Sequence, residues 1–385
     1  MRILVAHNYY QIPGGEDTVV KNEKNLLESH GDMVIEYVRS NTEINSFSIW
    51  KKLMLPFTTV FNLRTFREVR KLIQEYSVDV VHVHNTLNII SPAIYYAALV
   101  ERIPVVQTVH NFRLVCPGAT FYRDGHICED CLRYGLGCSI KHSCYRNSKM
   151  QTLACVITTK IHRILGIYKK INYICLTEFT KKKICSVVNP KRVYIKPNFV
   201  YDQQGENQAD DYYIFVGRVE EIKGVDVLVD AFRCIPEKKL KIVGRGDLDE
   251  HIAERLKKEN IHNIELLGFK SHEEVNALLK HAKALIMCSQ WYETFGMVIA
   301  EAYSNGVPVI VGRIGNIKDL VDESVTGELF TYNDPEDMIA AIERFESKSQ
   351  REYAQNAYAY YCQNLTSESN YVTLHRIYEK VRGGK

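Results

Sequence analysis

The sequence predicts an α/β protein built from two doubly wound parallel sheets, each the centre of its own domain. Short runs of β-branched and apolar residues alternate with helical periodicity in both halves, which is the pattern of strand–helix–strand units. A polar, turn-rich stretch at 197–211 separates the halves. The 385 residues also suit two domains of roughly 100–200 residues each.

One segment of the first half indicates the kind of sheet. Val78-Asp-Val-Val-His-Val is nearly continuous valine, as expected of a strand that is buried on both faces. The strands expected in this half cover 3–6, 33–38, 78–83 and 104–108, and the helices cover 16–29, 65–75 and 91–101.

The second half repeats the alternation. Its expected strands cover 212–216, 240–243, 264–267, 284–288 and 308–311, and its expected helices cover 225–234, 248–258, 272–281, 297–305 and 335–347. A last helix at 367–381 carries an apolar stripe (Tyr371, Leu374, Ile377 and Tyr378) that needs a partner surface.

Charge is distributed unevenly between the halves. Residues 1–200 hold 27 Lys and Arg against 15 Asp and Glu, whereas residues 201–385 hold 22 against 31. The basic half could face nucleic acid, an anionic membrane surface or a phosphorylated acceptor, or could simply be a solvated basic face. No nucleic-acid-binding module is recognisable, and the acidic half opposes that interpretation.

The strongest chemical signal is the segment from Glu293 to Glu301. Phe295-Gly296-Met297 opens a helix there, so unpaired backbone N–H groups and the positive end of the helix dipole are available to an anion. The two carboxylates could grip opposite ends of one ligand, because each can accept two hydroxyl donors. The alternative is an ordinary acidic residue before a helix and another on its surface.

This motif resembles the retaining, nucleotide-sugar-dependent glycosyltransferases of the two-domain GT-B fold (glycosyltransferases group 1, family-4-like). The segments 213–224, 240–247, 264–269 and 302–311 are similar to that family's successive strand–loop units, and the resemblance covers about 212–330. It implies two Rossmann-like domains that face each other across a cleft and close by a hinge. The first would be 1–197 plus 366–385, with a Cys-rich insertion at 116–144, and the second 198–365.

The resemblance also implies roles for residues of the second domain. Arg218 and Lys223 would neutralise the donor diphosphate, which removes the need for a catalytic metal or other cofactor. Glu293 would hold sugar hydroxyls and Glu301 the ribose hydroxyls. The other expected donor-binding positions are Gly217, Gly244, Phe269, Lys270, Phe295, Gly296 and Met297.

Fewer residues of the first domain carry the resemblance. Gly14 and Gly15, after Pro13, resemble a glycine loop that lets the backbone approach donor and acceptor, although a plain turn would look the same. His110, at the end of an expected strand, resembles the histidine near the transferred sugar. His82 and His84, at the end of the preceding strand, are weaker candidates.

Five cysteines of the first half fall within 29 residues. Cys128 and Cys131 form a Cys-x-x-Cys unit, and Cys116, Cys138 and Cys144 flank it. Four of these thiolates would suit a tetrahedral structural zinc, while buried thiols or redox-labile pairs are the alternatives.

Two segments have the composition of membrane-surface elements. Residues 48–61 mix aromatic and aliphatic side chains with two lysines, and 160–170 are amphipathic and basic. No apolar run reaches the roughly 18–20 residues that would span a bilayer, and the chain does not start with a secretory pattern. We therefore expect a cytoplasmic protein, peripheral on the inner face of the plasma membrane.

The expected activity is transfer of a sugar from a UDP- or GDP-sugar to an acceptor hydroxyl with retention of configuration. The acceptor would be a lipid-linked or glycan intermediate of surface polysaccharide or lipopolysaccharide assembly. A GT-B nucleotide-sugar epimerase and a catalytically silent partner subunit are the alternatives, and the intact set Arg218, Lys223, Glu293 and Glu301 disfavours the silent subunit.

Overall fold

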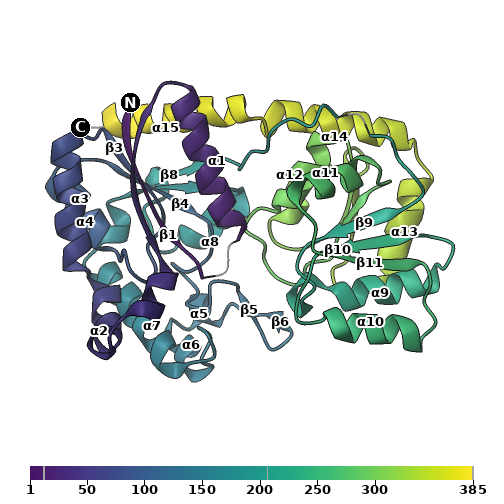
Figure 1. Ribbon diagram of the computed structural model, residues 1–385, viewed down its shortest axis with the longest axis horizontal. Coiled ribbons are helices and arrows are strands. Elements are labelled where there is room, and N and C mark those ends of the chain that lie inside the picture. Colours follow the sequence, from purple (N-terminus) through teal and green to yellow (C-terminus); the bar gives the residue numbers. More distant parts are fainter. Residues whose placement is uncertain (12–13, 206, 384–385) are drawn as a thin grey trace. The chain divides into compact units, whose positions relative to one another are not determined.

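A computed structural model describes residues 1–11, 14–205 and 207–383, which fall into two compact units (Figure 1). The first unit contains Met1–Phe121, Cys128–Pro197 and Asn370–Lys385. The second contains Tyr122–Ile127 and Asn198–Ser369. Among the residues described, no helix is both long and apolar enough to cross a membrane.

The first unit is a six-stranded parallel sheet with helices on both faces. Its strand order is β2-β1-β3-β4-β7-β8, so the order reverses between β1 and β3. The strands are β1 (Arg2–Tyr9), β2 (Met33–Ser40), β3 (Val80–Asn85), β4 (Val105–Val109), β7 (Asn172–Cys175) and β8 (Val193–Ile195). The helices are α1 (Gly15–Ser29), α2 (Ile49–Val60), α3 (Leu63–Tyr76), α4 (Ala93–Val100), α5 (Asp130–Arg133), α6 (Gly137–Lys141), α7 (Lys149–Ile164), α8 (Glu178–Ile184) and α15 (Ser367–Gly383).

The two faces of this sheet are covered by different helices. Ile3 and Val5 of β1 point to the face where α1 and α15 pack, and Leu374 and Ile377 of α15 are buried there. Leu4 of β1 points to the opposite face, which α3 and α4 cover. The apolar stripe of the last helix thus packs on the sheet that the first strand opens.

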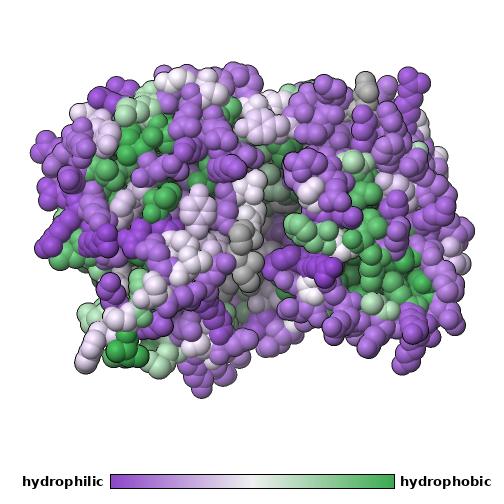
Figure 2. All heavy atoms as spheres, in the orientation of Figure 1, coloured by the Kyte–Doolittle hydropathy of each residue, from purple (hydrophilic) through white to green (hydrophobic). Residues whose placement is uncertain are grey.

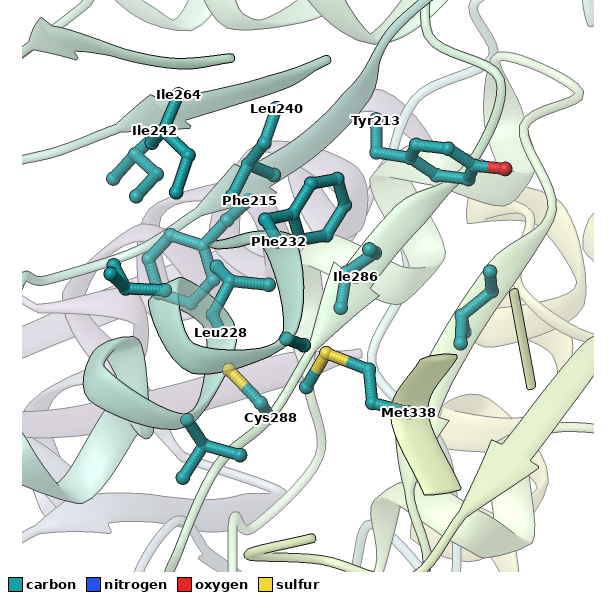
Figure 3. Packing of buried hydrophobic residues seen from close by; sticks show 14 of the residues in the cluster. Tyr213, Phe215, Leu228, Phe232, Leu240, Ile242, Ile264, Ile286, Cys288 and Met338 are labelled. Atoms are coloured by element: carbon teal, nitrogen blue, oxygen red, sulfur yellow. The ribbon is translucent and has the colours of Figure 1, made fainter. Parts of the chain in front are cut away.

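The second unit is also a six-stranded parallel sheet, in the order β11-β10-β9-β12-β13-β14. Its strands are β9 (Tyr213–Val216), β10 (Leu240–Val243), β11 (Ile264–Gly268), β12 (Leu285–Met287), β13 (Val309–Gly312) and β14 (Gly327–Phe330). Its helices are α9 (Val225–Cys234), α10 (Asp249–Lys258), α11 (His272–Lys280), α12 (Met297–Ser304), α13 (Pro335–Glu346) and α14 (Gln350–Asn364). Figure 3 shows Phe215, Leu228, Phe232 and Met338 meeting in the core between the sheet and its helices.

Apart from residues 122–127, the chain passes between the units after Pro197 and again after Ser369, and the second of these passages differs from the expected one. Residues 366–369 belong to the second unit, because Leu365 accepts a hydrogen bond from the N–H of Val200 there. The side chain of Asn370, by contrast, bonds to Lys196 and to the carbonyl of Pro197 in the first unit. The boundary therefore lies between 369 and 370 rather than between 365 and 366.

The Cys-rich insertion is also divided differently from the expectation. The short hairpin of β5 (Tyr122–Arg123) and β6 (His126–Ile127) belongs to the second unit, where the Tyr122 hydroxyl donates to Glu221 at 3.0 Å. The remainder of 116–144 stays with the first unit.

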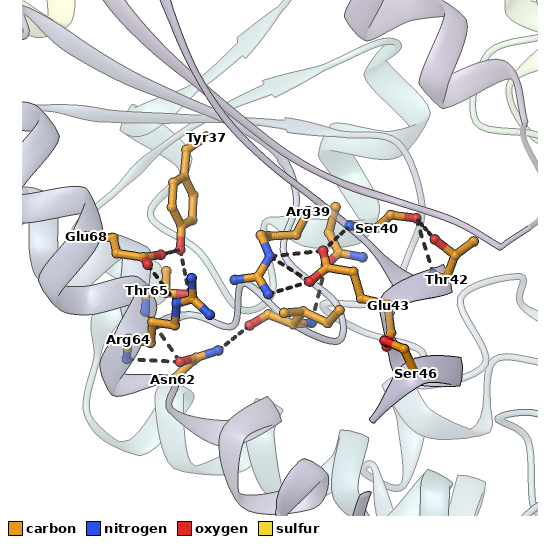
Figure 4. Close-up of polar contacts among 12 residues, drawn as sticks. Tyr37, Arg39, Ser40, Thr42, Glu43, Ser46, Asn62, Arg64, Thr65 and Glu68 are labelled. Carbon is orange, nitrogen blue, oxygen red and sulfur yellow. Dashed lines mark hydrogen bonds and ion pairs between the residues drawn. The ribbon is translucent and has the colours of Figure 1, made fainter. Parts of the chain in front are cut away.

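Polar side chains fix both ends of the segment that carries α2 (Figure 4). Before α2, Arg39 forms a two-pronged ion pair with Glu43, whose carboxylate also accepts the N–H of Ser40. After α2, Asn62 caps α3 by accepting the N–H groups of Arg64 and Thr65, and its amide donates to the carbonyl of Ile89 at 2.7 Å. The segment between these anchors is therefore held at the surface of the first unit.

Candidate active site

The candidate site of the second unit lies where three neighbouring strands end. The loops after β10, β9 and β12 carry Gly244, Lys223 and Glu293, and these strands are adjacent in the sheet. The strand order reverses between β9 and β12, which is where open α/β sheets bind ligands. The fold therefore brings together three of the positions that the sequence motifs single out.

An ion pair joins two of these loops. The Lys223 ammonium, in a short 3-10 turn after β9, donates to Glu293 Oε1 at 2.5 Å. Ser289 Oγ and Trp291 Nε1 donate to the same carboxylate oxygen at 2.8 Å each. The side-chain amide of Asn316 donates to the Glu293 carbonyl. Glu293 is thus held from both its side chain and its backbone.

These contacts keep the Glu293 carboxylate charged. Burial alone would raise the pKa of Glu293, but the attraction of Lys223 and the hydrogen bonds from Lys223, Ser289 and Trp291 outweigh it. The net result is a pKa below the usual carboxyl value. The loop after β12 therefore presents a buried anion, fixed in place next to a cation.

Two glycines shape the loops around this pair. Gly244 has φ +139°, and a Cβ there would lie 1.8 Å from the carbonyl oxygen of Gly217, so the loops after β10 and β9 touch through their backbones. Gly244 is thus required for this contact with Gly217, and the expected approach of a nucleotide to Gly244 stays a prediction. Gly296 precedes α12 with φ +92°, a conformation that L side chains rarely adopt. It turns the chain so that α12 begins at Met297.

The other predicted residues of this unit differ in exposure and in their partners. The Arg218 side chain is exposed and donates to Glu220 at 2.7 Å, rather than contacting Lys223 or Glu293. Burial raises the pKa of Glu301 on α12.

Phe269 is exposed, and the Lys270 ammonium pairs with Glu274 at 3.1 Å. Phe295 is buried beside the glycine turn.

In the first unit, the ends of β3 and β4 place histidines together. His84 Nδ1 lies 2.9 Å from His110 Nε2, and the two rings are stacked with centroids 5.2 Å apart. Both residues line a pocket of about 70 Å³ together with Asn85, Asn111 and Arg113. The sequence pointed to His110 as the principal candidate, and the structure pairs it with His84.

The glycine loop after β1 is described in part. Pro13 lies outside the described residues. Gly14 is the N-cap of α1, its N–H donates to Asp17 at 2.9 Å, and a Cβ on Gly14 or Gly15 would meet no atom within 4 Å. Asp17 also contacts His7 Nε2 at 2.7 Å. Sequence reasoning missed His7, although it ends the first apolar run just as His84 and His110 end theirs.

The cysteine segment gathers several thiols. Burial and the neighbouring thiols of Cys116, Cys144 and Cys138 together raise the pKa of Cys131 to about 12. Among the described residues, no three cysteines have sulfur atoms that all lie within 4.8 Å of one another. Zinc binding by four of the five cysteines therefore stays a prediction.

Comparison with known proteins identifies the class. Residues 199–360, nearly the whole second unit, match the family model for glycosyl transferases group 1. An uncharacterized glycosyltransferase of Methanocaldococcus jannaschii, MJ1178, is 26% identical over 88% of this chain and 86% of its own length. Residues 199–360 therefore match the glycosyl transferases group 1 family, and the chain as a whole is similar to glycosyltransferases.

Two further comparisons extend over almost the full chain. An uncharacterized 41.2 kDa protein in the cps region of Klebsiella pneumoniae is 23% identical, covering 92% of this chain and 95% of that protein. The crystal structure of Anabaena HepE in complex with UDP superposes with a TM-score of 0.69 at 16% identity, covering 98% of this chain and 99% of HepE. The latter likeness establishes the GT-B fold for both units.

Proposed function

We propose that the chain transfers a sugar from a nucleoside diphosphate donor to an acceptor hydroxyl with retention of configuration, without a catalytic metal. The observation that carries this proposal is the Lys223–Glu293 pair at the strand ends of the second unit. A cation beside a carboxylate suits a ligand that has a diphosphate at one end and hydroxyls at the other.

The chemistry follows from these groups. The acceptor oxygen forms a bond to the anomeric carbon on the same face from which the bond to the phosphate oxygen breaks, and the hydroxyl proton passes to the departing phosphate oxygen. Negative charge then develops on the leaving nucleoside diphosphate, where Lys223 and Arg218 would stabilise it. Glu293 would accept hydrogen bonds from sugar hydroxyls and Glu301 from the ribose. The amides of Phe295, Gly296 and Met297 would meet the sugar or phosphate, Phe269 and Lys270 the base, and Gly14, Gly15 and Gly217 would leave room for donor and acceptor.

Surface polysaccharide assembly is the proposed setting. Its support is the relative in the cps region of Klebsiella pneumoniae and the basic character of the first half of the chain. A lipid-linked or glycan acceptor would fit that setting. UDP-sugars are the first donors to test, because HepE was crystallised with UDP.

The test is a thermal-shift panel of UDP- and GDP-sugars followed by product analysis. A specific donor at about 100 times its Kd should stabilise the folded chain by about 2.7 kcal/mol. NMR of the product with a lipid-linked acceptor should reveal an anomeric configuration equal to that of the donor. Turnover of the donor to an epimer without acceptor would support the epimerase instead, and an inverted product would contradict retention.

A membrane surface is the proposed location of the enzyme. The apolar side chains of α2 are exposed rather than buried: Trp50 is 75% and Phe57 is 68% exposed, next to the exposed Lys51 and Lys52. Figure 2 shows apolar side chains at the surface in the region of α2. The neighbouring α7 adds exposed Met150, Leu153, Ile157, Ile161 and Ile164. Apolar side chains flanked by lysines suit the surface of a bilayer with anionic lipids.

Flotation with vesicles of phosphatidylcholine and phosphatidylglycerol tests this location. Introducing W50E together with F57E should lower the bound fraction about tenfold, because two carboxylates replace inserted rings. V100E is the matched control, since Val100 is also an exposed apolar residue but lies at the end of α4. Equal binding of wild type, the double variant and V100E would contradict the proposal.

We also propose that four of the five clustered cysteines hold a structural zinc. The support is the nearness of the Cys131 thiol to those of Cys116, Cys138 and Cys144. Elemental analysis of the purified chain should find about one zinc per molecule, lost in the Cys131→Ser variant. A chain purified without chelator that contains no zinc would contradict the proposal.

A further inference from the structure

A buried carboxylate lies at the centre of the first unit. Glu23 of α1 is 2% exposed, and one of its oxygens accepts a hydrogen bond from the ammonium of Lys196 at 2.9 Å. Lys196 is 1% exposed and also donates to Asn370 of α15 at 3.0 Å. Carboxylate and ammonium neutralise each other, so this ion pair adds no net charge to the core.

The second oxygen of Glu23 faces two histidines of β3. Oε1 lies 3.1 Å from His82 Nδ1 and 3.4 Å from His84 Nε2. Three such side chains could coordinate a cation, but Lys196 already supplies the positive charge. His82 is also occupied, with Tyr378 at 2.6 Å from its Nδ1 and Thr108 at 2.8 Å from its Nε2. The cluster is therefore a network of proton donors and acceptors.

Within this network, the protonated nitrogen of His84 determines which nitrogen of the neighbouring histidine carries a proton. The 3.4 Å between Glu23 Oε1 and His84 Nε2 is long for a hydrogen bond, and Nε2 has no nearer partner among the described residues, whereas Oε1 also faces His82 Nδ1 at 3.1 Å. A proton on Nε2 places a donor against the carboxylate, whereas a bare Nε2 would set two lone pairs against each other. The imidazole of His84 then has its lone pair on Nδ1.

His110 completes the sequence. Its Nε2 lies 2.9 Å from His84 Nδ1, so it must carry the proton of that hydrogen bond when His84 Nδ1 accepts. The Nδ1 of His110 is then left with a lone pair. Burial lowers the pKa of His84 to about 3 and holds the pKa of His110 well below its usual value, so both rings stay neutral.

We propose that Glu23 and His84 are positioning residues for His110: Glu23 fixes the proton of His84 on Nε2, and His84 fixes that of His110 on Nε2, leaving His110 Nδ1 as an acceptor. In hydrolases and at metal sites, a buried carboxylate likewise orients a histidine, and that histidine contacts the nucleophile or the metal. This inference rests on the proposed function only where it assigns His110 a role in sugar transfer. The proton positions follow from the geometry of the first unit.

Three variants of the full chain test the proposal. H84F removes the acceptor for His110 Nε2–H, and kcat for transfer should fall about 10- to 100-fold while the KM for the donor changes little. H84N is the rescue variant, because its Oδ1 can accept the same hydrogen bond, and about tenfold of the lost kcat should return. H82F is the matched control: His82 is equally buried on the same strand and also faces Glu23, but its polar neighbours are Glu23, Thr108 and Tyr378 rather than His110.

The direct readout is the tautomer of His110, from 15N NMR of histidine-labelled protein without any substrate. His110 should carry its proton on Nε2 in wild type, H82F and H84N, and should become a mixture in H84F. A double variant, E23L with K196M, removes the ion pair as two apolar groups of similar volume and should also give a mixture. It tests the role of Glu23 even if H84F does not fold.

The outcomes separate this inference from the proposed function. An unchanged His110 tautomer in E23L/K196M and H84F, or equal kcat losses in H82F and H84F, would overturn it. A wild-type chain that transfers no sugar would contradict the proposed function and leave the tautomer experiment to be judged by itself.

Discussion

Each unit is a six-stranded parallel sheet, but the two differ in strand order and in the chemistry at their strand ends. In each sheet the strand order reverses once, between β1 and β3 in the first unit and between β9 and β12 in the second. The second unit places a charged pair there, Lys223 with Glu293. The first unit places the imidazoles of His84 and His110, which burial keeps neutral. One architecture therefore supports two different sites, and function has to be argued from the side chains.

The largest difference between the two units is expected when the cation of the second unit, Lys223, is removed. Lys223→Met should lower transfer about 10²- to 10³-fold and abolish donor binding, because the diphosphate loses its positive partner. The fold should survive, since Ser289 and Trp291 still donate to Glu293. Transfer kinetics and a thermal shift with UDP measure both effects.

Lys238→Met is the control for that variant. Lys238 forms a comparable half-buried ion pair with Glu346 in the same unit. It should lose some stability and keep donor binding. Equal loss of transfer in both variants would mean that Lys223 acts through stability alone.

A smaller effect on a different step is expected from the first unit. His110→Ala should lower transfer about 10²-fold, as expected for loss of a positioned hydrogen-bond acceptor. Donor binding should stay intact, because the donor is proposed to bind residues of the second unit. If nucleotide affinity fell as far as in Lys223→Met, the proposed division of roles between the units would be wrong.

Acid should weaken the first unit before the second. His84, with burial lowering its pKa to about 3, stays neutral in the folded chain, whereas an unfolded histidine binds a proton below about pH 6.5. Stability is therefore lost as pH falls from 6.5 toward 3, by about 1.4 kcal/mol per pH unit for each such histidine. The pKa of Glu293 lies below the usual carboxyl value despite its burial, so its contribution persists down to that lower folded value.

Hydrogen exchange of the full chain between pH 7 and 5 measures this difference, after correction for the intrinsic pH dependence of exchange. Protection should fall in β3 and β4 while β9 and β12 keep theirs. Uniform loss across both sheets would contradict the prediction.

The smallest effect is expected from removing metal. Transfer in excess EDTA should stay within about twofold of the untreated rate, because Lys223 and Arg218 supply the positive charge that a cation would otherwise provide. Zinc content measured on the same sample distinguishes a structural zinc from a catalytic one. Loss of transfer that Mg²⁺ or Mn²⁺ restores would contradict this prediction.

The second unit was the easier one to predict from sequence. Lys223, Glu293 and Gly296 lie in short motifs whose spacing carries the family resemblance, and the expected helices there agree with α9 to α13 within two residues at either end. What the motifs could not indicate was the use of each residue. Only the structure shows that the backbone of Gly244 touches that of Gly217. It also shows that the Arg218 side chain is exposed and bonds to Glu220.

The first unit yielded less to sequence reasoning. The strands β7 and β8, and β14 in the other unit, were not among the expected strands, although equally short strands such as β12 were. The residues around His110 come from distant parts of the chain, with Glu23 and Lys196 separated by 173 positions. Glu23 looks like any polar residue of an amphipathic helix until the fold places it against a buried lysine.

The position of α15 has a consequence for how the protein is made. A ribosome releases β1 first, yet Leu374, Ile377 and Tyr378, which complete the core around Ile3 and Val5, are synthesised only after the whole of 198–369. The second unit is almost continuous in sequence and can fold during synthesis. The first must hold an unfinished apolar face until its last helix arrives, which makes it the part of the nascent chain most dependent on chaperones.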